Sequence, residues 1–156
     1  MEVLTVLSVV FITSAIISKL TKGKWNIITS GNAAMCFMLC FTAVGHVLYA
    51  QGMAMIIPSF IPFRQEIVYL TGIMEVLMGV LLLFPRYRRA TGIVIILFFT
   101  IILPCNIYQA IHYIDLATAT YNGAGPSYLW FRISLQVFLI GWVYYFSVKK
   151  ITLKTF

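Results

Sequence analysis

Glu75 is the first residue in this sequence whose type and position suggest chemistry. It lies within the apolar stretch TGIMEVLMG, about 15 Å along a helix from Gln65 at a rise of 1.5 Å per residue. A charge at that depth in a membrane costs about 2.5–3.5 kcal/mol. Gly72 and Gly79 share its helix face, and small residues let a neighbouring helix approach closely. We therefore expect Glu75 to face other helices, either in a site or as a protonated acid that bonds two helices together.

Two more polar side chains interrupt apolar stretches, His46 and Asn106. His46 shares a helix face with Thr42, and it is expected to be either a ligand-binding group or a hydrogen-bonded structural residue. Asn106 follows Pro104, which lacks an N–H and so frees the carbonyl of Thr100 for a side chain or a water. Both residues are candidates for a polar site inside the membrane.

Arg132 and Gln136 are one helical turn apart at the start of the last apolar stretch. Arg132 either extends to the membrane surface or recognises an anion or acid. Gln136 lies about one turn deeper and needs a hydrogen-bonding partner there. Together with the preceding residues they predict a pocket lined by His46, Glu75, Asn106, Arg132 and Gln136.

The cysteines Cys36, Cys40 and Cys105 all lie in apolar segments and form no CxxC motif. An odd number at such positions is not a disulfide framework, and packing is favoured over redox use. The sequence also lacks a metal-ligand cluster, a nucleotide-binding loop and a Ser-His-Asp pattern. We therefore expect no metal and no bound cofactor, and an enzyme acting alone is disfavoured.

The elements that carry these residues are predicted to be membrane-spanning helices. Of the 156 residues, 62% are hydrophobic and 10% are charged, with a mean hydropathy of +0.98, whereas soluble domains carry roughly 25% charged residues. The predicted spans cover about 3–18, 33–50, 65–84, 90–111 and 130–147, close to the roughly 20 residues that cross a bilayer. They form one domain, residues 1–156.

The segments between the spans carry the turn signals. Ser30 or Asn32 is expected to cap the second span. The stretch MAMIIPSFIPF contains Pro58 and Pro62, so we expect an irregular cap or re-entrant loop there. A cleaved signal peptide is the alternative for the first span, but the sequence begins Met-Glu and no A-x-A site follows this stretch.

The basic residues predict how the spans are oriented. The net charge is +7, and five spans place nine basic residues on one side and only Arg64 and Arg132 on the other. By the positive-inside rule the N-terminus is outside and the C-terminus is cytoplasmic. Nucleic-acid binding is disfavoured, because no basic stretch is interleaved with stacking aromatics. The basic side comprises Lys19, Lys22, Lys24, Arg86, Arg88, Arg89, Lys149, Lys150 and Lys154.

Four motifs follow one another over about residues 43–142. They are a Gly-His in GHVLYAQG, a Tyr-Leu-Thr-Gly-Ile-x-Glu helix that ends in Pro and basic residues, a Pro-x-Asn-Ile-Tyr, and an Arg-x-x-x-Gln in WFRISLQVF. In this order they resemble the DoxX family of small membrane proteins. The resemblance implies a four-helix transmembrane bundle, about residues 33–148, with one extra N-terminal transmembrane helix. The resemblance also implies that the five pocket residues are positions of the family's motifs, but it assigns them no catalytic role.

Some DoxX-like proteins are linked to thiosulfate–quinone oxidoreduction or redox-stress membrane complexes, and related proteins assist receptor assembly. The expected function is therefore an inner-membrane protein, in contact with membrane lipid, whose outward-facing polar pocket takes a small lipophilic or quinone-like ligand. It would act alone or with a membrane protein partner in a redox complex. The alternative is a non-enzymatic assembly or scaffold protein whose polar interior is structural. A small transporter is weaker, because no inverted repeat is visible.

Overall fold

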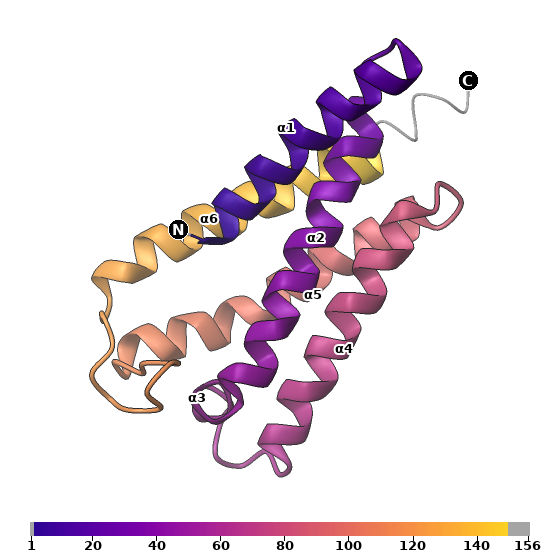
Figure 1. Ribbon diagram of the computed structural model, residues 1–156. Helices are drawn as coiled ribbons and strands as arrows, with labels where there is room; N and C mark the ends of the chain where they lie inside the picture. The colour runs from indigo at the N-terminus through magenta and orange to yellow at the C-terminus, as the bar shows by residue number, and fades with distance from the viewer. Residues whose placement is uncertain (1, 150–156) are drawn as a thin grey trace.

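Five long apolar helices make up most of the molecule (Figure 1). The computed structural model describes residues 2–149 and only the backbone of Lys22. Within this range the protein is all-helical and has no strands, only an isolated bridge between Asp115 and Thr120. The elements are α1 (Glu2–Lys22), α2 (Ile27–Leu48), α3 (Ala50–Met55), α4 (Arg64–Leu83), α5 (Arg88–Ile111), α6 (Ser127–Val143) and the π-helical segment η1 (Tyr144–Lys149).

The five long helices follow the predicted spans in order, and each is long and apolar enough to cross a membrane when η1 is counted with α6. The predicted start of the second span at residue 33 was wrong. The α2 helix begins at Ile27, because the side-chain Oδ1 of Asn26 accepts a hydrogen bond from the N–H of Thr29 at 3.2 Å. Ser30 and Asn32, the expected caps, lie inside α2 and are buried.

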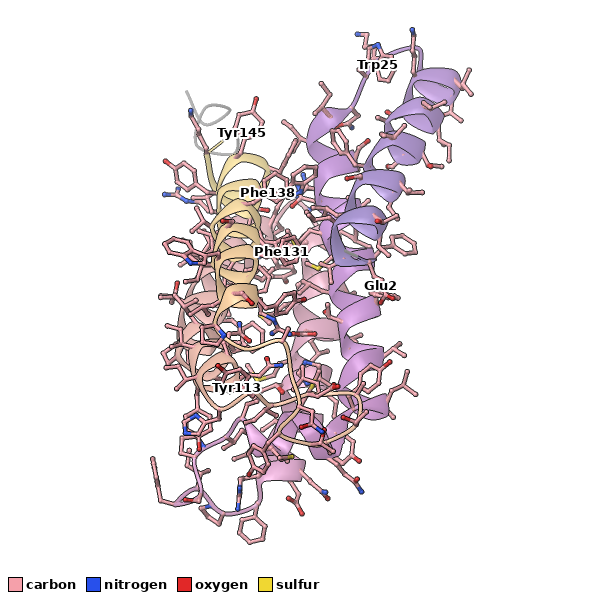
Figure 2. The ribbon with its side chains drawn as sticks, turned by 90° about the vertical axis from the view of Figure 1, so that its left-hand side faces the viewer. Glu2, Trp25, Tyr113, Phe131, Phe138 and Tyr145 are labelled. Carbon is pink, nitrogen blue, oxygen red and sulfur yellow. The ribbon has the colours of Figure 1, made fainter. Side chains whose placement is uncertain are left out.

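The long helices run antiparallel in succession, so their connections gather at two ends of the molecule (Figure 1). The 23–26 and 84–87 connections lie towards the same end as η1. The α3 helix and the 56–63 and 112–126 segments lie towards the other end. Figure 2 shows the same separation, with Trp25 and Tyr145 towards one end and Tyr113 near the other.

Buried apolar side chains from several helices form the core between them. Fully buried members are Met35 and Leu39 from α2, Leu82 from α4, Ile95 from α5 and Val143 from α6. By contrast, large apolar side chains on all five long helices are exposed on the outside. An exposed apolar surface of this extent suits lipid rather than water. It includes Ile12, Phe37, Leu70, Leu97 and Val137.

The proline-containing stretch after α2 is partly helical. The α3 helix takes in Met53–Met55, which the sequence had suggested would be irregular, while residues 56–63 form turns and bends. The backbone of Leu116 passes so close to Gly52 that a Cβ at this position would overlap its carbonyl. The 112–126 segment therefore packs directly on α3 and closes this end of the helices.

Candidate functional site

Glu75 faces the interior of the molecule and is buried, as the sequence predicted. Its Oε2 accepts a hydrogen bond from the hydroxyl of Thr42 on α2 at 2.8 Å. Its Oε1 lies 3.4 Å from Nε2 of His46, also on α2. Gly72 lets the two helices come together here, because a Cβ at that residue would lie 2.9 Å from Cβ of His46.

The backbone fixes which nitrogen of His46 carries a proton. Its Nδ1 lies 2.9 Å from the carbonyl oxygen of Val68, which can only accept, so Nδ1–H is the donor. The hydroxyl of Thr71 donates to the same carbonyl at 2.8 Å. A favourable contact between Nε2 and Glu75 then requires one more proton, on either the imidazole or the carboxyl. His46 and Glu75 therefore form a pair that can hold one exchangeable proton.

His46 also lines an apolar groove of about 340 Å³ between α2 and α4. The mouth of the groove carries exposed apolar side chains, among them Val47, Tyr69 and Ile73. Glu75 is not among the lining residues, so His46 is the member of the pair that meets the groove. The full lining is Cys40, Ala43, Val44, His46, Val47, Tyr69, Gly72, Ile73 and Val76.

The other three predicted residues form a second hydrogen-bonded group between α5 and α6. Arg132 donates from Nη1 to Oδ1 of Asn106 at 2.9 Å. Nδ2 of Asn106 donates to Oε1 of Gln136 at 3.3 Å, and Nε2 of Gln136 donates to the carbonyl of Phe99. We call this chain of hydrogen bonds, from Arg132 through Asn106 and Gln136 to Phe99, the relay. The guanidinium at one end only donates and the carbonyl at the other end only accepts, so the orientation of both side-chain amides is fixed.

Pro104 in α5 was expected to leave the carbonyl of Thr100 free for Asn106 or a water. The structure shows a side-chain bond one residue earlier, at Phe99, and the donor is Gln136 from α6. Asn106 bonds Arg132 and Gln136 instead.

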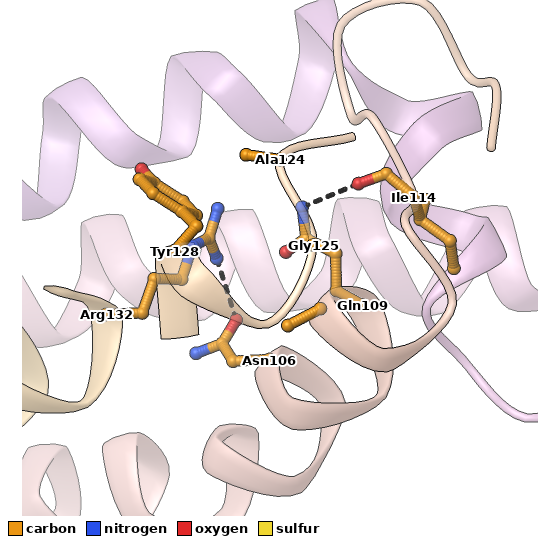
Figure 3. Close-up of a pocket in the computed structure, with 8 residues that line it drawn as sticks. Asn106, Gln109, Ile114, Ala124, Gly125, Tyr128 and Arg132 are labelled. Atoms are coloured by element: carbon orange, nitrogen blue, oxygen red, sulfur yellow. Dashed lines mark hydrogen bonds between the residues drawn. The ribbon is translucent and has the colours of Figure 1, made fainter. Parts of the chain in front are cut away.

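A small cavity of about 20 Å³ lies beside this relay, where α5 and α6 meet the 112–126 segment (Figure 3). Asn106, Gln109, Tyr128 and Arg132 line it together with the backbone at Gly125. Gln109 is a functional candidate that the sequence reasoning did not select. The signal was available, since Gln109 follows Asn106 by about one helical turn.

The five predicted residues thus lie in two groups, His46 with Glu75 and Asn106 with Arg132 and Gln136. Among residues 2–149 no hydrogen bond or ion pair joins the two groups. Neither of the two cavities described above is lined by members of both. The single pocket expected from the sequence is therefore replaced by a groove on α2 and α4 and a cavity on α5 and α6.

A third polar cluster, missed by the sequence reasoning, joins α2 to the π-helical segment. Asn32 donates to the carbonyls of Ile28 at 2.8 Å and Phe146 at 3.1 Å, and its Oδ1 accepts from Ser147 at 2.7 Å. Asn32 and Ser147 are almost fully buried, and their hydrogen-bonding groups are paired with each other and with backbone. This cluster holds η1 against α2 and has a structural role.

Arg88 also has a structural role, although the sequence placed it among the basic loop residues. Its side chain is buried and donates from Nε to the carbonyl of Leu82 at 3.0 Å and from Nη2 to that of Leu83 at 3.4 Å. These carbonyls are at the C-terminal end of α4, where they lack helical donors. Lys150 and Lys154 lie outside the described residues.

The cysteines are free thiols in the structure. Cys36 is buried, while Cys40 and Cys105 are partly buried, and Cys40 contributes to the wall of the groove. Among residues 2–149 no group of three or more His, Cys, Asp or Glu side chains is placed to hold a metal ion.

The family model described as Domain of unknown function (DUF8561) matches residues 35–147, which is most of the chain. The chain belongs to this family. The DUF8561 region runs from Met35 in α2 to Ser147 in η1, so it contains both polar groups, the groove and the cavity, and it leaves α1 outside. No curated protein and no solved structure matches the chain.

Proposed function

We propose that this DUF8561 protein is a multi-pass protein of the cell (inner) membrane that binds a small lipophilic or quinone-like molecule in the groove between α2 and α4. The observation that carries the proposal is the position of His46. His46 lines an apolar groove of about 340 Å³, and its imidazole is backed by the buried carboxyl of Glu75 at 3.4 Å. Mostly apolar pockets of this size with a few polar groups are typical of small-molecule sites.

The chemistry of the groove favours a ring that carries a hydrogen-bond acceptor. The side chains of Val44, Ile73 and Val76 offer apolar walls to a ring or a hydrocarbon tail. The Nε2–Oε1 contact of 3.4 Å is longer than a typical hydrogen bond of about 2.9–3.0 Å, so Glu75 engages a proton on Nε2 only weakly and a ligand carbonyl in the groove can share it. A quinone-like molecule combines these two features. In a redox complex, a partner protein would supply the electrons.

The DoxX-like kinship is part of this proposal. It is supported by the four ordered motifs, whose His46, Glu75, Asn106 and Arg132 positions all fall on α2, α4, α5 and α6. A four-helix core of α2, α4, α5 and α6, with α1 added, is supported by the family match, which begins within α2. The added helix packs on α2 and meets α6 where the rings of Phe11 and Trp142 lie 5.1 Å apart.

The proposed orientation has the N-terminus outside and the C-terminus in the cytoplasm. Lys19, Lys24, Arg86 and Arg89 lie near the end of the molecule that carries the 23–26 and 84–87 connections. The positive-inside rule assigns such an end to the cytoplasm. The groove and the cavity then lie towards the outer side.

Equilibrium dialysis of purified full-length protein in detergent against decyl-benzoquinone tests the ligand proposal. Val76→Trp fills the groove and is expected to weaken binding by about tenfold or more, since one lost contact of 1.4 kcal/mol gives tenfold. Val80→Trp is the matched control, because Val80 is on the same helix, similarly exposed, and outside the groove. His46→Phe is expected to weaken binding while its ring still fills the space.

The scaffold alternative is favoured by one observation, that the described polar groups of Asn106, Gln136, His46 and Glu75 already bond within the protein. The same experiment separates the two functions. Absence of saturable quinone binding by the folded wild-type protein would reject the ligand proposal, and so would equal weakening by Val76→Trp and Val80→Trp.

A further inference from the structure

The cavity between α5 and α6 contains a buried acceptor with no partner. Gln109 is only 9% exposed, and its Oε1 has no hydrogen bond among the described residues. Its Nε2 donates to the carbonyl of Ile114 at 3.1 Å. A flipped amide would set two acceptors against each other, so the free oxygen is fixed on the cavity side, towards Arg132 (Figure 3). Leaving such a group unpaired costs about 1–3 kcal/mol, so the site favours an added donor.

Arg132 supplies unused donors on the opposite side of the same cavity. Its guanidinium lies 5.3 Å from the ring centre of Tyr128 and gives one hydrogen bond, from Nη1 to Asn106. No carboxylate among residues 2–149 lies within ion-pair distance of it. The cavity thus presents a cation with free N–H groups next to a carbonyl oxygen that needs a donor. That combination fits an anion that carries a hydrogen-bond donor of its own.

The place of the cavity in the fold indicates where such an anion is found. It lies where α5 ends and α6 begins, and the adjoining segments carry exposed aromatic side chains at Tyr113, Tyr121 and Trp130. Tyrosine and tryptophan gather at the level of lipid headgroups in membrane proteins. At about 20 Å³ the cavity admits a hydroxyl or ammonium group but not a whole phosphate, which has to remain at the mouth beside Arg132.

We propose that this cavity binds a phosphate group that has an N–H or O–H donor attached a few atoms away, as in phosphoethanolamine and phosphoglycerol headgroups. The phosphate oxygens accept hydrogen bonds from Arg132, and the ammonium or hydroxyl enters the cavity and donates to Oε1 of Gln109. This site is separate from the proposed quinone groove, and it recognises a headgroup rather than an apolar ring.

Native mass spectrometry of the full-length protein, titrated with lipids, tests the proposal. Phosphatidylethanolamine and phosphatidylcholine form a matched pair, because both are zwitterionic and only the ethanolamine has N–H donors. Wild-type protein is expected to bind the ethanolamine lipid about tenfold more tightly, the equivalent of one charge-assisted hydrogen bond. Equal binding of the two lipids by the wild type would overturn the proposal without the use of any variant.

Variants assign the selectivity to the cavity. Arg132→Ala is expected to weaken binding of both lipids about tenfold, whereas Arg64→Ala removes a charge at the same end and leaves binding unchanged. Gln109→Met removes the acceptor and is expected to abolish the preference for ethanolamine. Equal loss with Arg64→Ala and Arg132→Ala would show non-specific charge attraction and would contradict the proposal.

A competition experiment with a water-soluble compound identifies the source of the phosphate. Phosphoethanolamine without acyl chains is added as a competitor to the lipid-bound protein. If it displaces the lipid at millimolar concentration, with the same dependence on Arg132, the site takes the free phosphate compound as well. If it fails while the lipid preference holds, the ligand is the membrane lipid. Both results support the donor-bearing phosphate, and only the two outcomes named above overturn it.

Discussion

His46 on α2 and Glu75 on α4 are ionisable residues in apolar helices, and the groups around them determine where a proton can be held. The carbonyl of Val68 holds Nδ1 of His46 as a donor at 2.9 Å, and this leaves Nε2 to share a proton with Glu75. The hydroxyl of Thr42 donates a hydrogen bond to the other carboxyl oxygen of Glu75 at 2.8 Å. Each member of the pair has a polar partner, which reduces the cost of burying ionisable groups between apolar helices.

Glu75→Ala is expected to lower the free energy of unfolding by about 1–3 kcal/mol, because it leaves Nε2 of His46 without its buried partner, while the hydroxyl of Thr42 can still donate to the carbonyl of Leu39. The measurement is the unfolding midpoint in a mild detergent. Glu66→Ala is the control, since Glu66 is exposed on the same helix. Equal midpoints for the two variants would contradict a hydrogen-bonded role for Glu75.

The relay between α5 and α6 is expected to behave as one unit. In a double-mutant cycle, Asn106→Ala and Gln136→Ala are each destabilising, and together they cost less than their sum by about 0.5–3 kcal/mol, as residues in one network do. A cycle of Asn106→Ala with Gln65→Ala, an exposed residue of α4, is expected to be additive. Additivity within the relay pair would mean that the hydrogen bond between Asn106 and Gln136 carries no coupling.

Intramembrane polarity is enough to predict the individual candidates but not their partners. Glu75 and His46 could be selected because a buried ionisable group must find a partner. The sequence does not state which helices are neighbours, so the pairing of Asn106 with Gln136 and of His46 with Glu75 became visible only in the fold. Gln109 could have been selected from its spacing to Asn106, but its unusual property, an unpaired oxygen, depends on the position of Ile114.

The contact between α2 and α4 is the element on which the groove depends. Gly72 and Gly79 both face α2, and a Cβ at Gly79 would lie 3.2 Å from the carbonyl oxygen of Cys36. Small residues at this spacing were correctly interpreted in the sequence as a close helix–helix contact. The start of α2 was not correctly predicted, because Asn26 caps the helix from within a lysine-rich segment and the helix begins more than a turn earlier than expected.

Gly72→Ala is expected to push α4 away from α2, since the new Cβ would lie 2.9 Å from Cβ of His46. The expected result is a loss of stability of about 1–3 kcal/mol, typical of overpacking. Gly141→Ala is the control, because that position has open space and alanine is a better helix former by about 0.5–1 kcal/mol. Stabilisation by both substitutions would contradict a tight α2–α4 interface.

For the whole molecule, the five long helices were predictable from the lengths of the apolar stretches, and the turn residues between those stretches indicated where one helix ends and the next begins. The packing of the 112–126 segment on α3 was not predictable, because it depends on the backbone of Leu116 meeting Gly52. The charge distribution gives the proposed orientation. Arg88 is one of the basic residues on the proposed cytoplasmic side, but its side chain also donates a hydrogen bond to the end of α4. Its position therefore has a structural reason that does not depend on the orientation of the protein.

The orientation can be measured in whole cells with single cysteines in a background where the three native cysteines are alanine. Lys24→Cys and Arg86→Cys are expected to react only with a membrane-permeant maleimide. Thr118→Cys, exposed in the 112–126 segment, is expected to react with an impermeant one added outside. The reverse labelling pattern would invert the proposed topology, and reaction of Lys24→Cys and Arg86→Cys from opposite sides would contradict the five-span fold.

The central claim is that the groove between α2 and α4 is a binding site for a lipophilic ligand. Photocrosslinking with an azido-benzoquinone, followed by mass mapping of the modified residues, tests it most directly. The account predicts modification within Cys40–Val47 of α2 and Tyr69–Val76 of α4, suppressed by excess decyl-benzoquinone. Modification spread over the exposed apolar faces of all the helices, or confined to α5 and α6, would contradict it.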